Sequence, residues 1–130
     1  MKRLILFAAL LFTVTLGINS SIATKASPEH KKQRAVTQFN QPVNLLGVVL
    51  KGEYLFVHDD EAMMRGEACT FVYEGSAAID RKLVVSFHCV PAERVKALGF
   101  TVRMENVAGV QKLREYQFKG DTEAHTVPAR

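Results

Sequence analysis

The stretch Cys69–Cys89 reads CTFVYEGSAAIDRKLVVSFHC and holds both cysteines of the chain. Two apolar-rich runs flank a polar segment, and each run alternates with a period of two, which is typical of antiparallel strands joined by a turn. If Cys69 lies opposite Cys89, then Phe71 faces Phe87, and the odd-numbered positions of both runs share one apolar face. The even-numbered positions, among them His88, would face solvent. The stretch therefore predicts a hairpin whose register is fixed by burial of its odd-numbered face.

The same register makes the two sulfur atoms neighbours. Two cysteines in an exported chain favour a single disulfide. A Cys69–Cys89 bond would close a loop of ~20 residues and stabilise the fold by roughly 3 kcal/mol in the chain-entropy model. Free buried thiols and metal ligation are the alternatives that the pattern leaves open. We expect a structural disulfide.

The rest of the chain carries further short β-type segments separated by turn residues. Two segments differ and have helix start and stop signals: residues 59–66, which open with acidic residues, and residues 91–98, which open with a proline and are followed by Gly99. The pattern predicts an all-β fold, a small antiparallel β-sandwich or barrel with two short helical turns. The expected strands are 36–41, 43–50, 53–58, 67–74, 82–89, 100–107 and 112–119.

The N-terminus has the three parts of a signal peptide. A basic Lys2-Arg3 pair precedes an uncharged apolar run, and small residues follow up to Ala23. The apolar run is shorter than the ~20 residues that cross a bilayer, so we expect residues 1–23 to be a cleaved signal peptide, with Ala26 as the second-choice cleavage site. No transmembrane segment is expected after cleavage. The protein is therefore predicted to be exported, either to a periplasm or to the medium.

Three parts are expected beyond the leader. Residues 24–34 are polar and contain Pro28, which is typical of a flexible linker. Residues 35–120 form the β domain, and the polar residues 121–130 form a loose C-terminal tail.

The net positive charge of the chain comes from residues near its N-terminus. The whole sequence has a formal charge of +4, but from residue 35 onward it holds 11 basic and 12 acidic residues. Nucleic-acid binding needs a basic face that neutralises phosphates. The folded domain is therefore not expected to bind nucleic acid.

Residues 39–54 contain a spaced pattern of aromatic, glycine and leucine residues: Phe39-x-x-Pro42, then Leu46-Gly47-x-x-Leu50-x-Gly52-x-Tyr54. The pattern resembles the opening of small secreted bacterial β-domain proteins that are largely uncharacterised. The resemblance implies an exported β domain, and it supplies no activity and no functional residue.

Metal binding is a further possibility, because the chain offers imidazole, thiol and thioether groups of the kind that bind copper or zinc. His88 and Cys89 are adjacent in an expected strand, so they point to opposite faces and do not suit one ion. The remaining arrangement would combine His58, and either Asp59 or Asp60, with His88 on an exposed face. Separate surface histidines are the competing interpretation. The complete set of candidate soft ligands is His58, His88, His125, Cys69, Cys89, Met63 and Met64.

No catalytic motif is present in the sequence. The serines lack a G-x-S-x-G setting, and no C-x-x-C or H-E-x-x-H occurs. We therefore do not expect an enzyme. The leading hypothesis is an exported cell-envelope protein with a binding or structural role, which contacts an unknown protein or small ligand through a sheet face or edge. The alternative is a small periplasmic copper- or zinc-binding protein.

Overall fold

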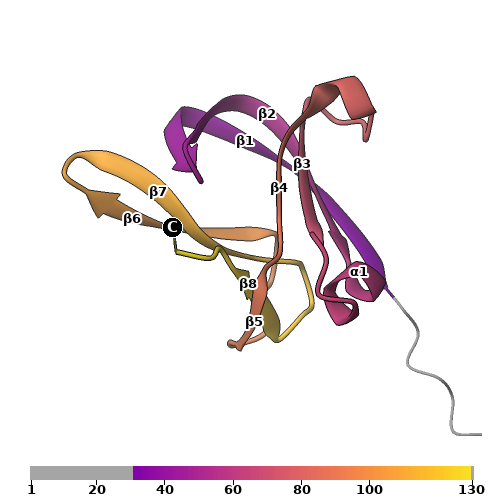
Figure 1. Cartoon of the computed structure of the whole chain (residues 1–130). Helices are drawn as coiled ribbons and strands as arrows, with labels where there is room; N and C mark the ends of the chain where they lie inside the picture. The colour runs from indigo at the N-terminus through magenta and orange to yellow at the C-terminus, as the bar shows by residue number, and fades with distance from the viewer. Residues whose placement is uncertain (1–30, 130) are drawn as a thin grey trace, which may run out of the picture.

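A computed structural model describes residues 31–129 of the chain. Eight strands form one sheet that curves into a half-barrel (Figure 1). The all-β prediction is confirmed, whereas the strands form a single curved sheet and not the two packed sheets of a sandwich. The strands run β4-β3-β2-β1-β7-β8-β5, and β6 pairs with β7. The elements are β1 Lys32–Leu45, β2 Val48–Asp59, α1 Asp60–Met64, β3 Thr70–Glu74, η1 Asp80–Lys82, β4 Leu83–Phe87, β5 Val90–Glu93, β6 Thr101–Val107, β7 Val110–Gln117 and β8 Glu123–Thr126.

The first two strands form a long antiparallel hairpin. Its turn lies at Leu46 and Gly47, which both adopt left-handed backbone angles (φ 50° and 88°). Consecutive positive φ angles give the type of two-residue turn that matches the twist of a hairpin. The prediction of one strand over residues 43–50 is therefore wrong. The strand boundary predicted at Pro42 is also wrong, because a register shift between Phe39 and Val43 accommodates the proline within β1.

Strands β3 and β4 form the predicted hairpin, but the predicted register is wrong by one residue. Thr70 lies opposite Phe87, and Val72 lies opposite Val85. The cause is the pairing of β3 with β2: the inward positions of β2 are even-numbered, so His58 lies opposite Thr70. The even-numbered residues of β3 must then also face inward.

Only one of the two predicted helical turns forms as expected. Helix α1 falls within residues 59–66, and the Asp59 carboxylate caps it by accepting hydrogen bonds from the backbone N–H groups of Glu61 and Ala62. The helix predicted over residues 91–98 is wrong. Its first residues form β5, in which Pro91 lies opposite His125 of β8. Strand β5 is the last in the order, and an edge strand tolerates a proline.

The domain is longer at both ends than predicted. Strand β1 begins at Lys32, inside the segment expected to be a linker, and β8 lies inside the expected tail. Ala124 and His125 of β8 are buried. The predicted signal peptide 1–23 and residues 24–30 lie outside the described residues. Within the described part, no helix has the length and apolarity that a membrane crossing requires.

The connection between β4 and β5 joins the two ends of the strand order. These strands stand at opposite ends of the strand order, yet they are separated in sequence only by His88 and Cys89. The chain therefore passes from one edge of the curved sheet to the other (Figure 1). Most of the interior is apolar and aromatic, and its buried cluster consists of Phe39, Val43, Leu45, Leu50, Tyr54, Phe56, Ala62, Cys69, Val72, Phe87, Cys89, Leu113, Tyr116 and Phe118.

Candidate metal centre

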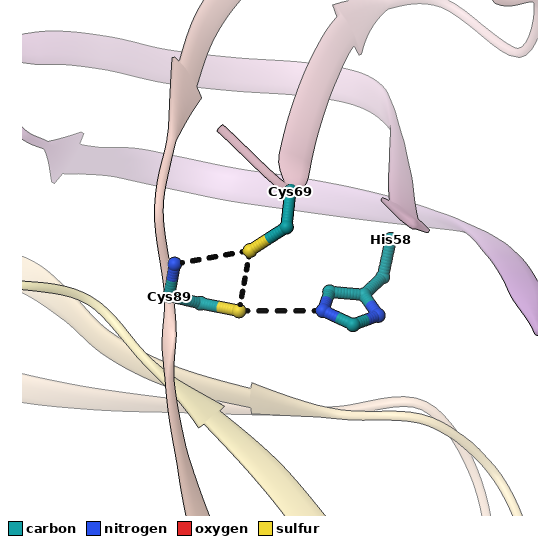
Figure 2. Close-up of side chains that lie close together, drawn as sticks. All are labelled: His58, Cys69 and Cys89. Carbon is teal, nitrogen blue, oxygen red and sulfur yellow. Dashed lines mark hydrogen bonds between the residues drawn. The ribbon is translucent and has the colours of Figure 1, made fainter. Parts of the chain in front are cut away.

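Four metal-ligating side chains meet in the interior, and we call them the Cys/His cluster: His58, Cys69, Cys89 and His125. His58 comes from the end of β2, Cys69 from the residue before β3, Cys89 from the β4–β5 connection, and His125 from β8. All four are at most 1% exposed. In Figure 2, the side chains of His58, Cys69 and Cys89 point toward one another.

The ligand atoms of three members of the cluster are close enough to share one ion. Those of His58, Cys69 and Cys89 all lie within 4.8 Å of one another. The sulfur of Cys89 is 3.0 Å from that of Cys69, 3.3 Å from His58 Nε2 and 3.6 Å from His125 Nδ1. The two imidazole rings lie side by side, with centroids 3.9 Å apart.

These separations are near those of tetrahedral zinc. With Zn–S near 2.3 Å and Zn–N near 2.0–2.1 Å, a tetrahedron has S···N edges of about 3.6 Å and an S···S edge of about 3.7 Å. The two sulfur–nitrogen distances of Cys89 match that edge within a few tenths of an ångström. The two sulfur atoms would separate by about 0.7 Å to reach the S···S edge.

Both histidines carry a buried ring nitrogen without a hydrogen bond to any group in residues 31–129, namely His58 Nδ1 and His125 Nε2. Such an unpaired buried nitrogen costs free energy. His58 Nδ1 lies 3.1 Å from a carboxylate oxygen of Asp60, although the pair lacks hydrogen-bond alignment. Histidine ligands commonly direct their outer nitrogen to a carboxylate. Asp60 is therefore placed to orient His58 with Nε2 toward the sulfur atoms.

Burial controls the protonation of the cluster. Desolvation, followed by repulsion from His58, lowers the pKa of His125 to about 4. Desolvation also lowers the pKa of His58, against the opposing charges of Asp60 and Asp59. Both rings are thus held in the neutral form that binds metals.

The thiol of Cys89 responds to burial in the opposite sense. Desolvation, together with a hydrogen bond to Cys69, raises the pKa of Cys89 to about 12. Without a cation the cysteine therefore keeps its proton at neutral pH. A bound divalent cation deprotonates a coordinating thiol outright, so metal binding at this cluster would release protons.

Neighbouring side chains hold the cluster in place. The ring of Tyr116 stacks on His125 at a centroid distance of 5.0 Å, and its hydroxyl is hydrogen-bonded to Thr70. Met63 of α1 brings its thioether sulfur to 3.9 Å from the sulfur of Cys89. The cluster is therefore contacted by an aromatic ring from β7 and by a thioether from α1.

The two cysteines are neighbours, as the sequence predicted, although the register behind that prediction is wrong. Their sulfur atoms are 3.0 Å apart, longer than the ~2.05 Å of a disulfide bond, and both are thiols. Cys69 precedes the first residue of β3 and lies outside its alternation, so it is buried next to the equally buried Thr70. The proximity of the two thiols is shown, and the disulfide itself stays a prediction.

The predicted metal residues are distributed differently. His58 is fully buried rather than surface-exposed, whereas His88 is exposed, and its Nδ1 lies 2.7 Å from the carbonyl oxygen of Glu67. Asp59 caps α1 and forms an ion pair with Lys32 at 3.4 Å. The structure brings His58 together with the two cysteines, and it adds His125. The sequence included His125 among the candidate soft ligands, but its assignment to a loose tail hid its proximity to the cluster.

A second feature lies on the other face of the sheet. A hollow of about 410 Å³ over β1, β2 and β3 is lined by two cationic side chains, the carboxylate of Asp59, two aromatic rings and three uncharged residues. Its principal side chains are Lys32, Arg34, Phe71 and Tyr73. The half-buried Phe71 faces this hollow because of the register of β3, which turns its odd-numbered residues outward.

The chain was compared with known proteins at three levels. No family model, no curated protein and no solved structure matches it.

Proposed function

We propose that this protein is an exported zinc-binding protein that holds one ion at the Cys/His cluster. The observation that carries the proposal is the burial of two thiols and two neutral imidazoles around the sulfur of Cys89, which lies 3.0 Å from the sulfur of Cys69, 3.3 Å from His58 Nε2 and 3.6 Å from His125 Nδ1. Sulfur and nitrogen ligands in a tetrahedral arrangement are typical of zinc. The exported location rests on the predicted leader, residues 1–23.

Charge favours zinc over copper(I). Two thiolates and Zn²⁺ sum to zero, whereas two thiolates and Cu⁺ leave one negative charge in a site that is inaccessible to solvent. Burying an uncompensated charge is costly. The thioether of Met63 is a ligand of the type that copper prefers. Its sulfur, however, lies 3.9 Å from the sulfur of Cys89, farther than the ring nitrogens of His58 and His125 at 3.3 Å and 3.6 Å. Copper(I) is therefore the competing ion in the same cluster.

The proposed role of the ion is structural binding. Four protein ligands would close the coordination sphere and leave no open position for a substrate, which is the arrangement of structural zinc sites. The ion would connect β2, β8, the residue before β3 and the β4–β5 connection. It would therefore join the two edges of the curved sheet at the point where the chain crosses between them.

The test is a zinc titration of the reduced, metal-free protein under anaerobic conditions. We expect one zinc per chain, with binding weakened by at least about tenfold in Cys89→Ser and in His125→Leu, because each variant loses one ligand. His88→Ala tests the exposed alternative, since the Nδ1 of His88 lies 4.0 Å from the sulfur of Cys69, and Met64→Ala, which removes an exposed thioether, is the matched control; both should bind zinc as the parent does. Retained binding in both ligand variants together with lost binding in His88→Ala would reject this cluster in favour of the exposed His58–His88 site.

The hollow over β1–β3 supports a second candidate function, binding of a small anionic ligand at a sheet face. Arg34 supplies a cation, Lys32 supplies a second one that is ion-paired with Asp59, and Phe71 and Tyr73 supply apolar surface. An anionic aromatic dye such as anilinonaphthalene sulfonate is a suitable probe. Arg34→Ala should weaken dye binding several-fold, whereas Arg103→Ala on β6 should leave it unchanged. Equal binding by the parent and Arg34→Ala would remove this candidate.

A further inference from the structure

We propose that oxidation of Cys69 and Cys89 to a disulfide releases the zinc ion, so that the oxidation state of the two cysteines controls metal occupancy. The inference rests on the proposed function, since it concerns the same cluster. The reason is that the two sulfur atoms that would bind zinc are also close enough to form a bond with each other.

The geometry places the thiols between two end states. Their 3.0 Å separation is about 1 Å longer than a disulfide bond and about 0.7 Å shorter than the S···S edge of a tetrahedral zinc site. Either state therefore requires a sub-ångström to ångström shift of the sulfur atoms. The two states exclude each other, because a disulfide has no thiolate to donate.

The flanking structure permits that shift without unfolding the sheet. Cys69 precedes β3, and Cys89 lies in the connection between β4 and β5, so neither cysteine belongs to a strand. Cys69 is nevertheless fixed at both backbone groups: its N–H donates to the carbonyl of Phe87, and its carbonyl accepts from Asp59 N–H. The change is thus confined to side-chain rotation and the short connection that contains Cys89.

Access determines the type of oxidant. Both sulfur atoms belong to fully buried residues, which a protein disulfide could not reach in the folded state. A small neutral peroxide is the appropriate class. One zinc-bound thiolate attacks the peroxide oxygen and becomes a sulfenic acid, and the second sulfur displaces water from it. Overall, one zinc dithiolate, one hydrogen peroxide and two protons give one disulfide, one Zn²⁺ and two waters.

Oxidation would leave only His58 and His125 as ligands. We expect zinc affinity to fall by at least about 100-fold, because two of four ligands and both negative charges are lost. By thermodynamic linkage, zinc binding must in turn change the reduction potential of the disulfide. Each tenfold gain in stability of the dithiol form through zinc binding raises the disulfide reduction potential by about 30 mV, so zinc favours the thiols.

The experiment compares the two oxidation states of the same chain. Reduced protein is loaded with zinc and treated with one equivalent of hydrogen peroxide. Released zinc is followed with a chromogenic chelator, and the chain mass is measured under denaturing, non-reducing conditions. We expect one zinc released for each chain whose mass falls by two hydrogens. Reduction should restore binding, and circular dichroism should show an unchanged sheet.

Other outcomes separate the two proposals. If the reduced protein binds no zinc, the proposed function fails and the redox inference fails with it. If the reduced and disulfide forms bind zinc with equal affinity, the proposed function stands and the redox inference is overturned. Zinc release accompanied by a gain of one or more oxygen atoms, without the loss of two hydrogens, also overturns it, because the ligands would then be destroyed rather than joined.

Discussion

The interior of the half-barrel is filled in two different ways. Its aromatic part is built around Phe56, whose ring lies 5.4 Å from the rings of both Phe100 and Tyr116. The Cys/His cluster fills the adjoining part with thiols and imidazoles that are equally inaccessible to solvent. Aromatic side chains gain free energy from burial alone, whereas buried imidazole nitrogens need partners. Under the proposed function, the aromatic part stabilises the metal-free fold, and a bound ion stabilises the cluster.

The largest expected effect comes from the aromatic part. Phe56→Ala should lower the free energy of unfolding by about 3–5 kcal/mol, since it removes a fully buried ring and leaves a cavity. Urea unfolding of the metal-free protein measures this loss. Val95→Ala is the control, because Val95 is 89% exposed and should change stability by less than about 0.5 kcal/mol. A loss below about 1 kcal/mol in Phe56→Ala would contradict the assigned role of the aromatic part.

Acid should destabilise the metal-free protein through the cluster. The pKa of His125 is about 4 in the folded state and near 6.5 in the unfolded state, so between these values the unfolded chain binds more protons. Stability is therefore full above pH 6.5 and declines as the pH falls toward 4, by about 3 kcal/mol from this residue. The lowered pKa of His58 acts in the same direction.

Urea unfolding in chelator-treated buffers measures how steeply the free energy of unfolding changes with pH across this range. His125→Leu should lose a large part of this pH dependence, while His88→Ala should keep it. Identical slopes in the parent and His125→Leu would show that His125 is not held neutral by burial.

Much of the fold could be predicted from the sequence. Two-residue alternation predicted the β3–β4 hairpin, strands were predicted near β6 and β7, and the acidic start of α1 predicted that helix. The β3 register could not be predicted from the hairpin alone, because the inward face of β2 determines it through His58 and Thr70. Pro91 suited a helix start equally well, and only pairing with β8 shows that it lies in a strand.

The candidate site was predicted less completely than the fold. The proximity of Cys69 and Cys89 was predicted, although from a hairpin register that is wrong by one residue, and the positions of the two histidines depend on long-range contacts. His125 joins the cluster because β8 pairs with β7 and brings it onto Tyr116. No local pattern around residue 125 encodes that pairing. Its position beyond a polar turn indicated a loose tail.

A smaller effect is expected from the Asp59 side chain that caps α1. Asp59→Ala should cost about 1 kcal/mol of unfolding free energy, since two backbone N–H groups of α1 lose their acceptor. Asp59→Asn, which keeps an acceptor oxygen, should recover most of it. Lys32→Ala separates the cap from the exposed ion pair and should cost less than about 0.5 kcal/mol. Chemical denaturation suffices, and equal losses in Asp59→Ala and Lys32→Ala would argue against the cap.

The smallest change in metal-free stability is expected within the cluster itself. At pH 8, where the histidines are neutral, His125→Leu should alter the unfolding free energy by no more than about 1 kcal/mol, because it removes an unpaired buried nitrogen along with the ring. The same variant should lose at least about half of the stabilisation by zinc, which for the parent is about 3 kcal/mol at a free zinc concentration 100 times Kd. Thermal unfolding with and without zinc checks both parts, and a zinc-dependent shift equal to that of the parent would exclude His125 as a ligand.

X-ray absorption at the zinc edge, on the reduced protein loaded with one equivalent, tests the central claim most directly. The account predicts two sulfur ligands at about 2.3 Å and two nitrogen ligands at about 2.0–2.1 Å. A zinc ion surrounded only by oxygen and nitrogen would contradict it, because Cys69 and Cys89 would then take no part in binding.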